Sequence, residues 1–386
     1  MRSWRVGGNE EKYLLELLNS GYPGSNPAGF TGRLEQAFAK RFGTRFAISF
    51  CNGTATLHAA LAALGVGPGD EVIVPSWTWL ATGMAPIYLG ATPVFVDGER
   101  DTLCMDPAAF EAAITTRTKA VIPVHLFGSL ADLDKIIPIA RKHCLKVVED
   151  CAHAHGAKWN GKGAGSFGDV GSFSFQQSKI MTAGEGGECI TSDPELFDRI
   201  GRISHIGYQF AAERGKPSTP PPTDLDCRNY RATDFQAVIL ADQLATLAED
   251  SRRRADNADY LHRELGKIPG ISTQKPGRCA TVQSYYVYGI TVDPAALKPG
   301  KTRDDVIAAL KAEGATAVFA GWGAPAFGQK LWNVSPKRYR VESSEVVQEI
   351  IDHRVILADI RWIDAERQTQ ELLVEAFRKV MAEYAR

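Results

Sequence analysis

The sequence lacks a long apolar run, and it lacks an excess of charge of either sign. Its 386 residues carry 44 Lys and Arg against 45 Asp and Glu, which gives a formal net charge of -1. Because so balanced a composition does not indicate a broad basic face, we expect no nucleic-acid partner. No apolar run approaches the length of a membrane span, so we expect no membrane association either.

Paired cysteines are also missing. The seven cysteines are scattered, odd in number and free of any Cys-x-x-Cys pair, so we expect free thiols in a reducing cytoplasm. The nearest approach to a metal cluster is Cys151, His153 and His155, whose alternating spacing is poor for zinc, and we expect no metal. The stretch 1–8 has two arginines and no apolar segment after them, so it does not resemble a signal peptide.

Short apolar, β-branched runs alternate with helical patterns through the first half of the chain. The runs are Arg45–Cys51, Glu71–Val74, Thr92–Val96, Ala120–Val124 and Lys146–Val148. Helical patterns such as Thr54–Leu64 and Ala131–His143 lie between some of them. This alternation is typical of buried parallel strands with crossover helices. It predicts an α/β fold in which helices cover both faces of a mostly parallel sheet.

The pattern changes in the second half. A long helical pattern runs from about 233 to beyond 252, and a strand at Ser284–Val292 and a helix at Arg303–Glu313 then begin a new unit. The expected division is a large domain over 1–255 and a smaller α/β domain over 256–386.

One lysine stands in a distinctive setting, in the stretch SFSFQQSKIMTAGEGG at Ser172–Gly187. Lys179 follows a short apolar strand and precedes a glycine turn, so its side chain can project from a sheet edge into a pocket. Burial or a nearby cation lowers the pKa of a lysine amine, and the neutral amine can then bind a carbonyl cofactor covalently. A solvated surface lysine is the alternative for any single lysine. A second motif argues against that alternative here.

That second motif is VVEDCAHAHG, at Val147–Gly156. Asp150 ends a buried strand, at the edge where ligands bind in open α/β sheets. A carboxylate there can pair with a protonated pyridine nitrogen, although for the aspartate alone a helix N-cap is an equally good interpretation. Of the two histidines that follow, His153 and His155, one can contact a cofactor ring or its phenolic oxygen, and we expect the other to be structural.

Two further motifs indicate a phosphate site and a stacking site. In CNGTATLH, Gly53 and Thr54 open a helix, whose N-terminus favours a phosphate, although a plain capped turn explains the motif as well. The absence of GxGxxG and of a Walker lysine disfavours a dinucleotide or ATP. In PSWTWLAT, Trp79 can stack on a flat ring, whereas we expect Trp77 in the core.

Taken in this order, the motifs resemble the DegT/DnrJ/EryC1/StrS aminotransferases, which are fold-type I enzymes dependent on pyridoxal 5′-phosphate (PLP). The resemblance runs from about Gly21 to the C-terminus and is strongest up to Arg231. It implies a large, mostly parallel sheet domain, a smaller C-terminal α/β domain and PLP as the cofactor. It also implies that Lys179 is the Schiff-base lysine and that Asp150 partners the pyridine nitrogen.

The resemblance implies roles for further residues. Trp79 would stack on the cofactor ring, and His153 would lie beside its oxygen. The phosphate would be held by Gly53, Thr54 and Ser174. The segment CRNYRATDFQ is similar to the family's N-x-R segment, in which Asn229 would reach the phosphate of the neighbouring subunit. The implied assembly is a homodimer with shared active sites.

The substrate is implied by the lysine motif. Lysine rather than histidine at position 179 is typical of the aminotransferases rather than the related dehydratases. The stretch FSFQQSKIMTAGEGG is especially similar to cyclitol aminotransferases of aminoglycoside biosynthesis, which use L-glutamine to aminate scyllo-inosose or 2-deoxy-scyllo-inosose. It therefore implies an amino-acid donor and a keto-cyclitol or keto-sugar acceptor. Gly321–Val334 is expected on the substrate side of the pocket, where aromatic residues such as those at 285, 286 and 322 are candidates for its lining.

Three alternatives stay open. The enzyme could aminate a nucleotide-linked keto-sugar, for which no obvious cluster of basic residues is visible. It could resemble the 3-amino-5-hydroxybenzoate synthases, to which the lysine motif is also similar. It could also be a PLP-binding regulator without turnover, although a complete lysine, aspartate and glycine set argues against an inactive site.

Overall fold

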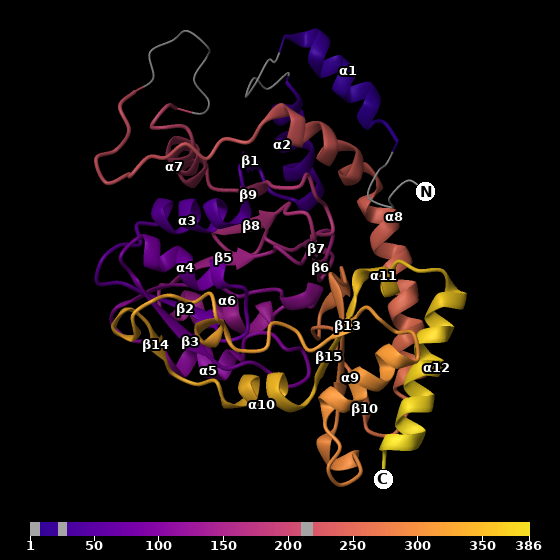
Figure 1. The fold of residues 1–386 in the computed structure, drawn as a ribbon. Helices are drawn as coiled ribbons and strands as arrows, with labels where there is room; N and C mark the ends of the chain where they lie inside the picture. Colours follow the sequence, from indigo (N-terminus) through magenta and orange to yellow (C-terminus); the bar gives the residue numbers. More distant parts are fainter. Residues whose placement is uncertain (1–7, 22–28, 210–218) are drawn as a thin grey trace.

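The computed structural model describes residues 8–21, 29–209 and 219–386. Residues 1–7 lie outside this part. They make up most of the stretch 1–8, which we found not to resemble a signal peptide. Figure 1 shows a large α/β unit and, at the C-terminal end of the chain, a smaller unit that packs beside it. No helix among the described residues is long and apolar enough to cross a membrane.

The large unit is built on a sheet of eight strands. Their order across the sheet is β1 (Phe46–Phe50), β9 (Gly187–Thr191), β8 (Val170–Ser174), β5 (Lys146–Asp150), β4 (Thr118–Val121), β2 (Glu71–Pro75), β3 (Thr92–Val96) and β14 (Arg340–Val341). All neighbouring pairs from β8 to β14 are parallel, and β9 runs antiparallel to both β8 and β1. The predicted mostly parallel sheet is therefore confirmed.

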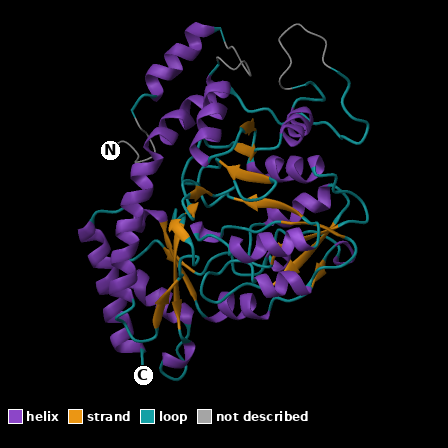
Figure 2. Ribbon diagram, turned by 180° about the vertical axis from the view of Figure 1, so that it is seen from behind, coloured by secondary structure: helices purple, strands orange, loops and turns teal. Residues whose placement is uncertain are grey.

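Helices cover both faces of this sheet, as Figure 2 shows from behind. They are α2 (Phe30–Phe42), α3 (Gly53–Ala63), α4 (Leu80–Tyr88), α5 (Pro107–Ala112), α6 (Leu133–Lys142), α7 (Pro194–Ser204) and α8 (Asp234–Leu265). Alternate strand residues enter two separate cores, because successive side chains of a strand point to opposite faces. Ile73 packs in the core that includes α2, α6 and α8, whereas Val72 and Val74 pack in the core that includes α3, α4 and α7.

The smaller unit has an antiparallel sheet in the order β10 (Ile271–Thr273), β12 (Val287–Val292), β15 (Val355–Asp359) and β13 (Val318–Phe319). Its helices include α9 (Arg303–Ala312), α11 (Ile360–Ile363) and α12 (Arg367–Tyr384), and α12 lies along α8 in Figure 1. Position 255 falls inside the continuous helix α8, so the division at 255/256 stays a prediction.

The C-terminal part of the chain also returns to the large unit. β14 adds the last strand of the large sheet, and α10 (Glu345–His353) contributes Val347, Ile350 and Ile351 to one of its cores. A third, small sheet joins β11 (Ala280–Val282) to β6 (Lys158–Trp159) and β7 (Lys162–Gly163). The remaining described α-helix, α1 (Glu10–Ser20), packs on α8.

Element ends differ from the predicted ones by a few residues, for local reasons. Strand β4 ends at Val121 rather than Val124, close to Pro123, which has no N–H to donate. Strand β5 continues to Asp150, which pairs with Ser172 of β8. Helix α3 begins at Gly53 because Asn52 caps it, with its side-chain oxygen 2.8 Å from the Ala55 N–H.

Candidate active site

The candidate residues gather at one edge of the large sheet. Strands β5 and β8 are parallel, and β1 runs in the same direction because both β1 and β8 are antiparallel to β9. Their carboxyl ends therefore lie at the same edge, and each leads into a predicted site residue: Gly53 after β1, Asp150 at the end of β5 and Ser174 at the end of β8. This is the edge where open α/β sheets bind ligands.

Asp150 is buried, and both of its carboxylate oxygens accept hydrogen bonds. Oδ1 accepts from the Ala152 N–H at 3.1 Å and Oδ2 from the Thr82 hydroxyl at 2.9 Å. Burial raises the pKa of Asp150, while these hydrogen bonds and the charge of Lys179 act in the opposite direction. No helix begins after Asp150, where the chain makes turns instead, so the helix N-cap alternative is wrong.

Lys179 lies in the loop between β8 and β9 and is half-buried, not a solvated surface lysine. Burial lowers the pKa of its amine to about 8, although the charge of Asp150 favours the ammonium form. Its Nζ lies 4.7 Å from the centroid of the Tyr286 ring. At a pH near 8 a substantial fraction of this amine is therefore neutral and able to take up a proton or attack a carbonyl carbon.

His153 is buried with its ring parallel to that of Tyr286, at a centroid distance of 4.1 Å and an angle of 11°. The Phe127 N–H donates to its Nδ1 at 3.3 Å. Burial and the nearby Lys179 charge lower the pKa of His153 well below its ordinary value, so the ring is neutral. Because Nδ1 accepts, the proton of the neutral ring belongs on Nε2, which leaves Nε2 a hydrogen-bond donor.

The other histidine of the motif, His155, has a different environment. It is fully buried, with the rings of Phe173 and Phe175 at centroid distances of 5.6 and 5.7 Å. Burial lowers its pKa to about 3. The neutral ring packs against these two phenylalanines, and the structural role expected for one of the two histidines stays a prediction.

Gly53 and Ser174 are in direct contact at the start of α3. A Cβ on Gly53 would lie 2.6 Å from the Cβ of Ser174, so only glycine allows the helix to approach this strand end so closely. Gly53 and Thr54 occupy the first turn of α3, where backbone N–H groups lack partners within the helix. The capped turn and the anion site are therefore compatible, since Asn52 caps one N–H and the helix start still faces the strand edge.

The two tryptophans of PSWTWLAT differ in exposure. Trp77 is 1% exposed, which confirms its predicted core position, whereas Trp79 is 44% exposed at the start of α4. The Trp79 ring meets Trp322 at a centroid distance of 5.7 Å. Trp322 also approaches His153, at 6.1 Å. The Gly321–Val334 segment therefore does reach the site, through Trp322.

Comparison with known proteins identifies the family. A model of the DegT/DnrJ/EryC1/StrS aminotransferase family matches residues 6–354. The chain belongs to this family. It is 42% identical over 312 residues to a putative L-glutamine:3-amino-2,3-dideoxy-scyllo-inosose aminotransferase of Streptoalloteichus tenebrarius, covering 78% of this chain and 72% of that protein.

Two further relatives name different acceptors. An L-glutamine:2-deoxy-scyllo-inosose aminotransferase of Streptomyces kanamyceticus is 40% identical, over 78% of this chain and 72% of that protein. A GDP-perosamine synthase of Caulobacter vibrioides is 39% identical, over 80% of this chain and 81% of that protein. Among solved structures, 3-amino-5-hydroxybenzoic acid synthase superposes with a TM-score of 0.82 and 29% identity, over 97% of this chain and 96% of that one. The predicted fold and aminotransferase class are confirmed.

Asn229 of this aminotransferase lies in the segment between helices α7 and α8. It is exposed, and its backbone forms a bridge with His205 after helix α7. The next residue, Tyr230, accepts a hydrogen bond from the Cys51 N–H at 2.7 Å, which ties this segment to the end of β1. A contact of Asn229 with a neighbouring subunit stays a prediction.

Sequence reasoning missed two contacts in the aminotransferase site. Thr82 lies in a motif that we had singled out, yet its bond to Asp150, 68 residues away in the sequence, was not anticipated. Tyr286 was only one of several candidates for the pocket lining. Its neighbour Tyr285, another candidate, instead packs in the core of the smaller unit.

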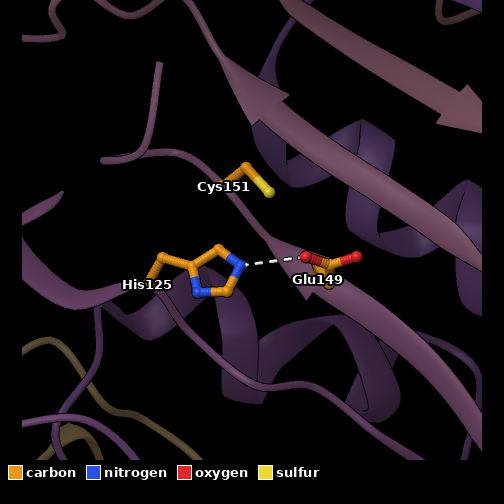
Figure 3. Close-up of side chains that lie close together, drawn as sticks. All are labelled: His125, Glu149 and Cys151. Atoms are coloured by element: carbon orange, nitrogen blue, oxygen red, sulfur yellow. Dashed lines mark hydrogen bonds and ion pairs between the residues drawn. The ribbon is translucent and has the colours of Figure 1, made fainter. Parts of the chain in front are cut away.

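Behind Asp150 lies a buried group with ligand-type side chains, His125, Glu149 and Cys151, drawn in Figure 3. The Ala131 N–H donates to Nδ1 of His125 at 3.1 Å, so Nε2 carries the proton and donates to Glu149 at 3.1 Å. The Glu149 carboxylate also accepts N–H bonds from Gly165, Phe167 and Gly168 at 2.7–2.8 Å. The His125 and Glu149 side chains are thus hydrogen-bonded to the protein itself. The backbone N–H of His125 donates to the Asp150 carbonyl at 3.1 Å and fixes the strand end.

Proposed function

We propose that this aminotransferase uses PLP to transfer the amino group of L-glutamine to a keto-cyclitol. The single observation that carries the proposal is the placement of Lys179 beside the buried carboxylate of Asp150 at the sheet edge. A lysine amine with a lowered pKa and a buried carboxylate are the two groups that PLP chemistry requires of a protein.

The surrounding residues fit PLP by their chemistry. Gly53, Thr54 and Ser174 would hold the phosphate, because the start of α3 offers N–H groups and Gly53 permits close approach. The exposed face of Trp79 would stack on the pyridine ring, and Asp150 would accept the proton of its nitrogen. These assignments, like that of Lys179, are part of the proposal.

His153 supplies a directional contact. Since its Nε2 carries the proton, this nitrogen can donate to a phenolic oxygen, and the acceptor bond at Nδ1 keeps the ring from turning over. His153 would therefore bind the oxygen of the cofactor and orient its ring.

The mechanism follows from how these side chains handle protons. Bound PLP would supply an electron sink for the carbon that loses its proton. Neutral Lys179 would act first as a base, accepting the proton of the α-carbon of the amino donor. The ammonium group formed in this way would then act as an acid and release the same proton later in the reaction. The Asp150 carboxylate, fixed by Thr82 and Ala152, stays a hydrogen-bond acceptor throughout.

The identity of the acceptor is proposed from the names of the relatives and from the aromatic residues that line the site. Two of the relatives above are named for glutamine and inosose derivatives, at 42% and 40% identity. Trp322 and Tyr286 bring an indole and a phenol to the site, and such amphipathic rings suit the faces and hydroxyls of a polyol ring. A nucleotide-linked keto-sugar is the second candidate, favoured by the 39% identity to GDP-perosamine synthase.

The assembly and compartment belong to the same proposal. A homodimer with shared sites is supported by the exposure of Asn229 in a segment tied to the end of β1. A reducing cytoplasm is supported by the seven cysteines, all of which are free.

The test compares acceptors under one donor. The purified full-length chain with PLP and L-glutamine should give a higher kcat/KM with scyllo-inosose or 2-deoxy-scyllo-inosose than with a GDP- or dTDP-linked 4-keto-sugar. A clear preference for the nucleotide-linked sugar would replace the acceptor and leave the cofactor assignment in place. Formation of an aromatic amine would instead favour a 3-amino-5-hydroxybenzoate synthase-like reaction. Binding of PLP without turnover of any acceptor would favour a regulator.

A further inference from the structure

The backbone passes from strand β11 to strand β12 of the smaller unit through Ser284–Tyr286, beside the active site and in an unusual conformation. Tyr285 has a φ of 52° and Phe127, on the facing loop, a φ of 58°. The Tyr286 N–H donates to the Phe127 carbonyl at 3.0 Å. A Cβ on Gly128 would lie 2.5 Å from the Tyr285 nitrogen, so the two loops are pressed together. Left-handed conformations of bulky residues cost free energy and persist at sites that need them.

The consequence of this crossing is the position of the Tyr286 side chain. Its ring lies parallel to His153 on one side, at 4.1 Å, and Nζ of Lys179 lies 4.7 Å from the ring centroid. Its hydroxyl is 2.8 Å from Oγ of Ser178, the residue directly before the lysine. Ser178 is held in turn by Oε1 of Gln176, at 2.7 Å. One side chain therefore contacts both the reactive amine and the loop that carries it.

We propose that Tyr286 is a positioning residue for Lys179, with its ring holding the ammonium form of the amine and its hydroxyl fixing the lysine loop through Ser178. The importance of this contact for turnover rests on the proposed function of Lys179. The contact itself can be tested without any cofactor.

The ring should matter for the protonation of the lysine because a cation within about 6 Å of an aromatic face is attracted to it. Burial lowers the pKa of Lys179 to about 8, and the charge of Asp150 opposes this effect. The aromatic face of Tyr286, 4.7 Å from Nζ, should oppose it as well. His153 and His155, the other titratable groups nearby, are neutral because burial lowers their pKa values. Removing the aromatic face should therefore lower the pKa of the amine further, by about half a unit to one unit.

The experiment measures the pKa of the Lys179 amine in the full chain freed of PLP by hydroxylamine and dialysis. Competitive labelling with trace acetic anhydride from pH 6 to 11, followed by peptide mass spectrometry, reports the pKa of each lysine. Tyr286→Met keeps an apolar side chain of similar length without an aromatic face, Tyr286→Phe keeps the face, and Tyr285→Phe is a matched control one residue away whose side chain lies in the other core.

We expect Tyr286→Met to lower the pKa of Lys179 by about half a unit to one unit, and both phenylalanine variants to leave it unchanged. A folded Tyr286→Met protein with the wild-type pKa would overturn the role of the ring. The hydroxyl is tested separately by hydrogen exchange over 176–186. Tyr286→Phe and Ser178→Ala should each speed exchange there, and the double variant should add nothing further. Unchanged exchange in both single variants would overturn the role of the hydroxyl, whether or not Tyr286→Met folds.

Discussion

The Thr82 hydroxyl donates to Oδ2 of Asp150 across 2.9 Å, and this contact determines the direction of a short chain of hydrogen bonds. Because the only hydroxyl hydrogen of Thr82 points to Asp150, the partner hydroxyl of Thr78, 2.7 Å away, must donate to Thr82. The backbone carbonyl of Thr78 in turn accepts from Gln329 at 3.3 Å. The carboxylate proposed to hold the pyridine nitrogen is thus oriented through α4 and the segment that carries Trp322.

The first prediction concerns this hydroxyl. Thr82→Val preserves the shape of the side chain but removes one hydrogen bond to a charged group, which is typically worth about 1.5–3 kcal/mol. We expect kcat to fall roughly tenfold or more, and Thr82→Ser, which restores the hydroxyl, to recover most of it. Steady-state kinetics with glutamine measures both.

Thr78→Val is the matched control, since Thr78 is also a buried threonine but does not contact Asp150. It should lose less activity than Thr82→Val. Asp150→Asn removes the carboxylate itself and should therefore have the lowest kcat of these variants. Equal activity of Thr82→Val and the wild type would show that the hydroxyl does not orient the carboxylate.

The second prediction concerns the shared site. Lys179→Ala and Asn229→Ala homodimers should each be nearly inactive, but a mixture after subunit exchange contains hybrids in which one of two sites is intact. Equal mixing should restore about a quarter of the wild-type activity, because about half of the dimers are hybrids. Exchange is verified by native mass spectrometry with one isotope-labelled chain. Verified hybrids without recovered activity would contradict the contribution of Asn229 to the partner's site.

The third prediction concerns two buried glutamates that have no part in the proposed site. Oε1 of Glu35 accepts from the Ser49 N–H at 2.9 Å, and Oε2 of Glu188 accepts from the Ser49 hydroxyl at 2.8 Å. Burial raises the pKa of Glu35 to about 8 and that of Glu188 well above its ordinary value, with Asp234 adding to the effect at Glu35 and Glu35 to that at Glu188. The folded protein therefore retains a proton that the unfolded chain releases above about pH 4.5.

Because the folded state binds more protons, this contribution to stability is full below pH 4.5 and is lost as the pH rises to about 8. Glu35→Gln removes the titration of Glu35 and leaves that of Glu188, so its Tm should fall less than that of the wild type between pH 5.5 and 8.5. Differential scanning calorimetry at several pH values measures the slope. The exposed Glu371→Gln should keep the wild-type slope. If Tm changed with pH as steeply in Glu35→Gln as in the wild type, Glu35 would not retain a proton in the folded protein.

The backbone of the site could be predicted from sequence because it depends on strand ends. Motifs at the carboxyl ends of β1, β5 and β8 had to converge once the strands were recognised, and this placed Gly53, Asp150 and Ser174 at one edge. Asp150 could be interpreted as a helix N-cap or as the partner of a pyridine nitrogen. Only the structure could separate these, because the choice depended on whether a helix follows Asp150.

The side-chain contacts that complete the site could not be predicted. Tyr285 and Tyr286 are adjacent and chemically identical, yet one enters the core of the smaller unit and the other the active site. The difference arises from a left-handed φ at Tyr285, which no periodicity of the sequence reveals. Strand β14 was missed for a related reason, because a strand of two residues carries no alternation to detect.

The identity of the reactive lysine is the central claim, and borohydride trapping tests it most directly. The full-length enzyme with PLP should be reduced, digested and searched for a pyridoxyl group by mass spectrometry. Lys179 should carry the pyridoxyl group, and a Lys179→Ala protein that folds like the wild type should carry none. A pyridoxyl group on another lysine, or an equal yield of modification in the Lys179→Ala protein, would contradict the account.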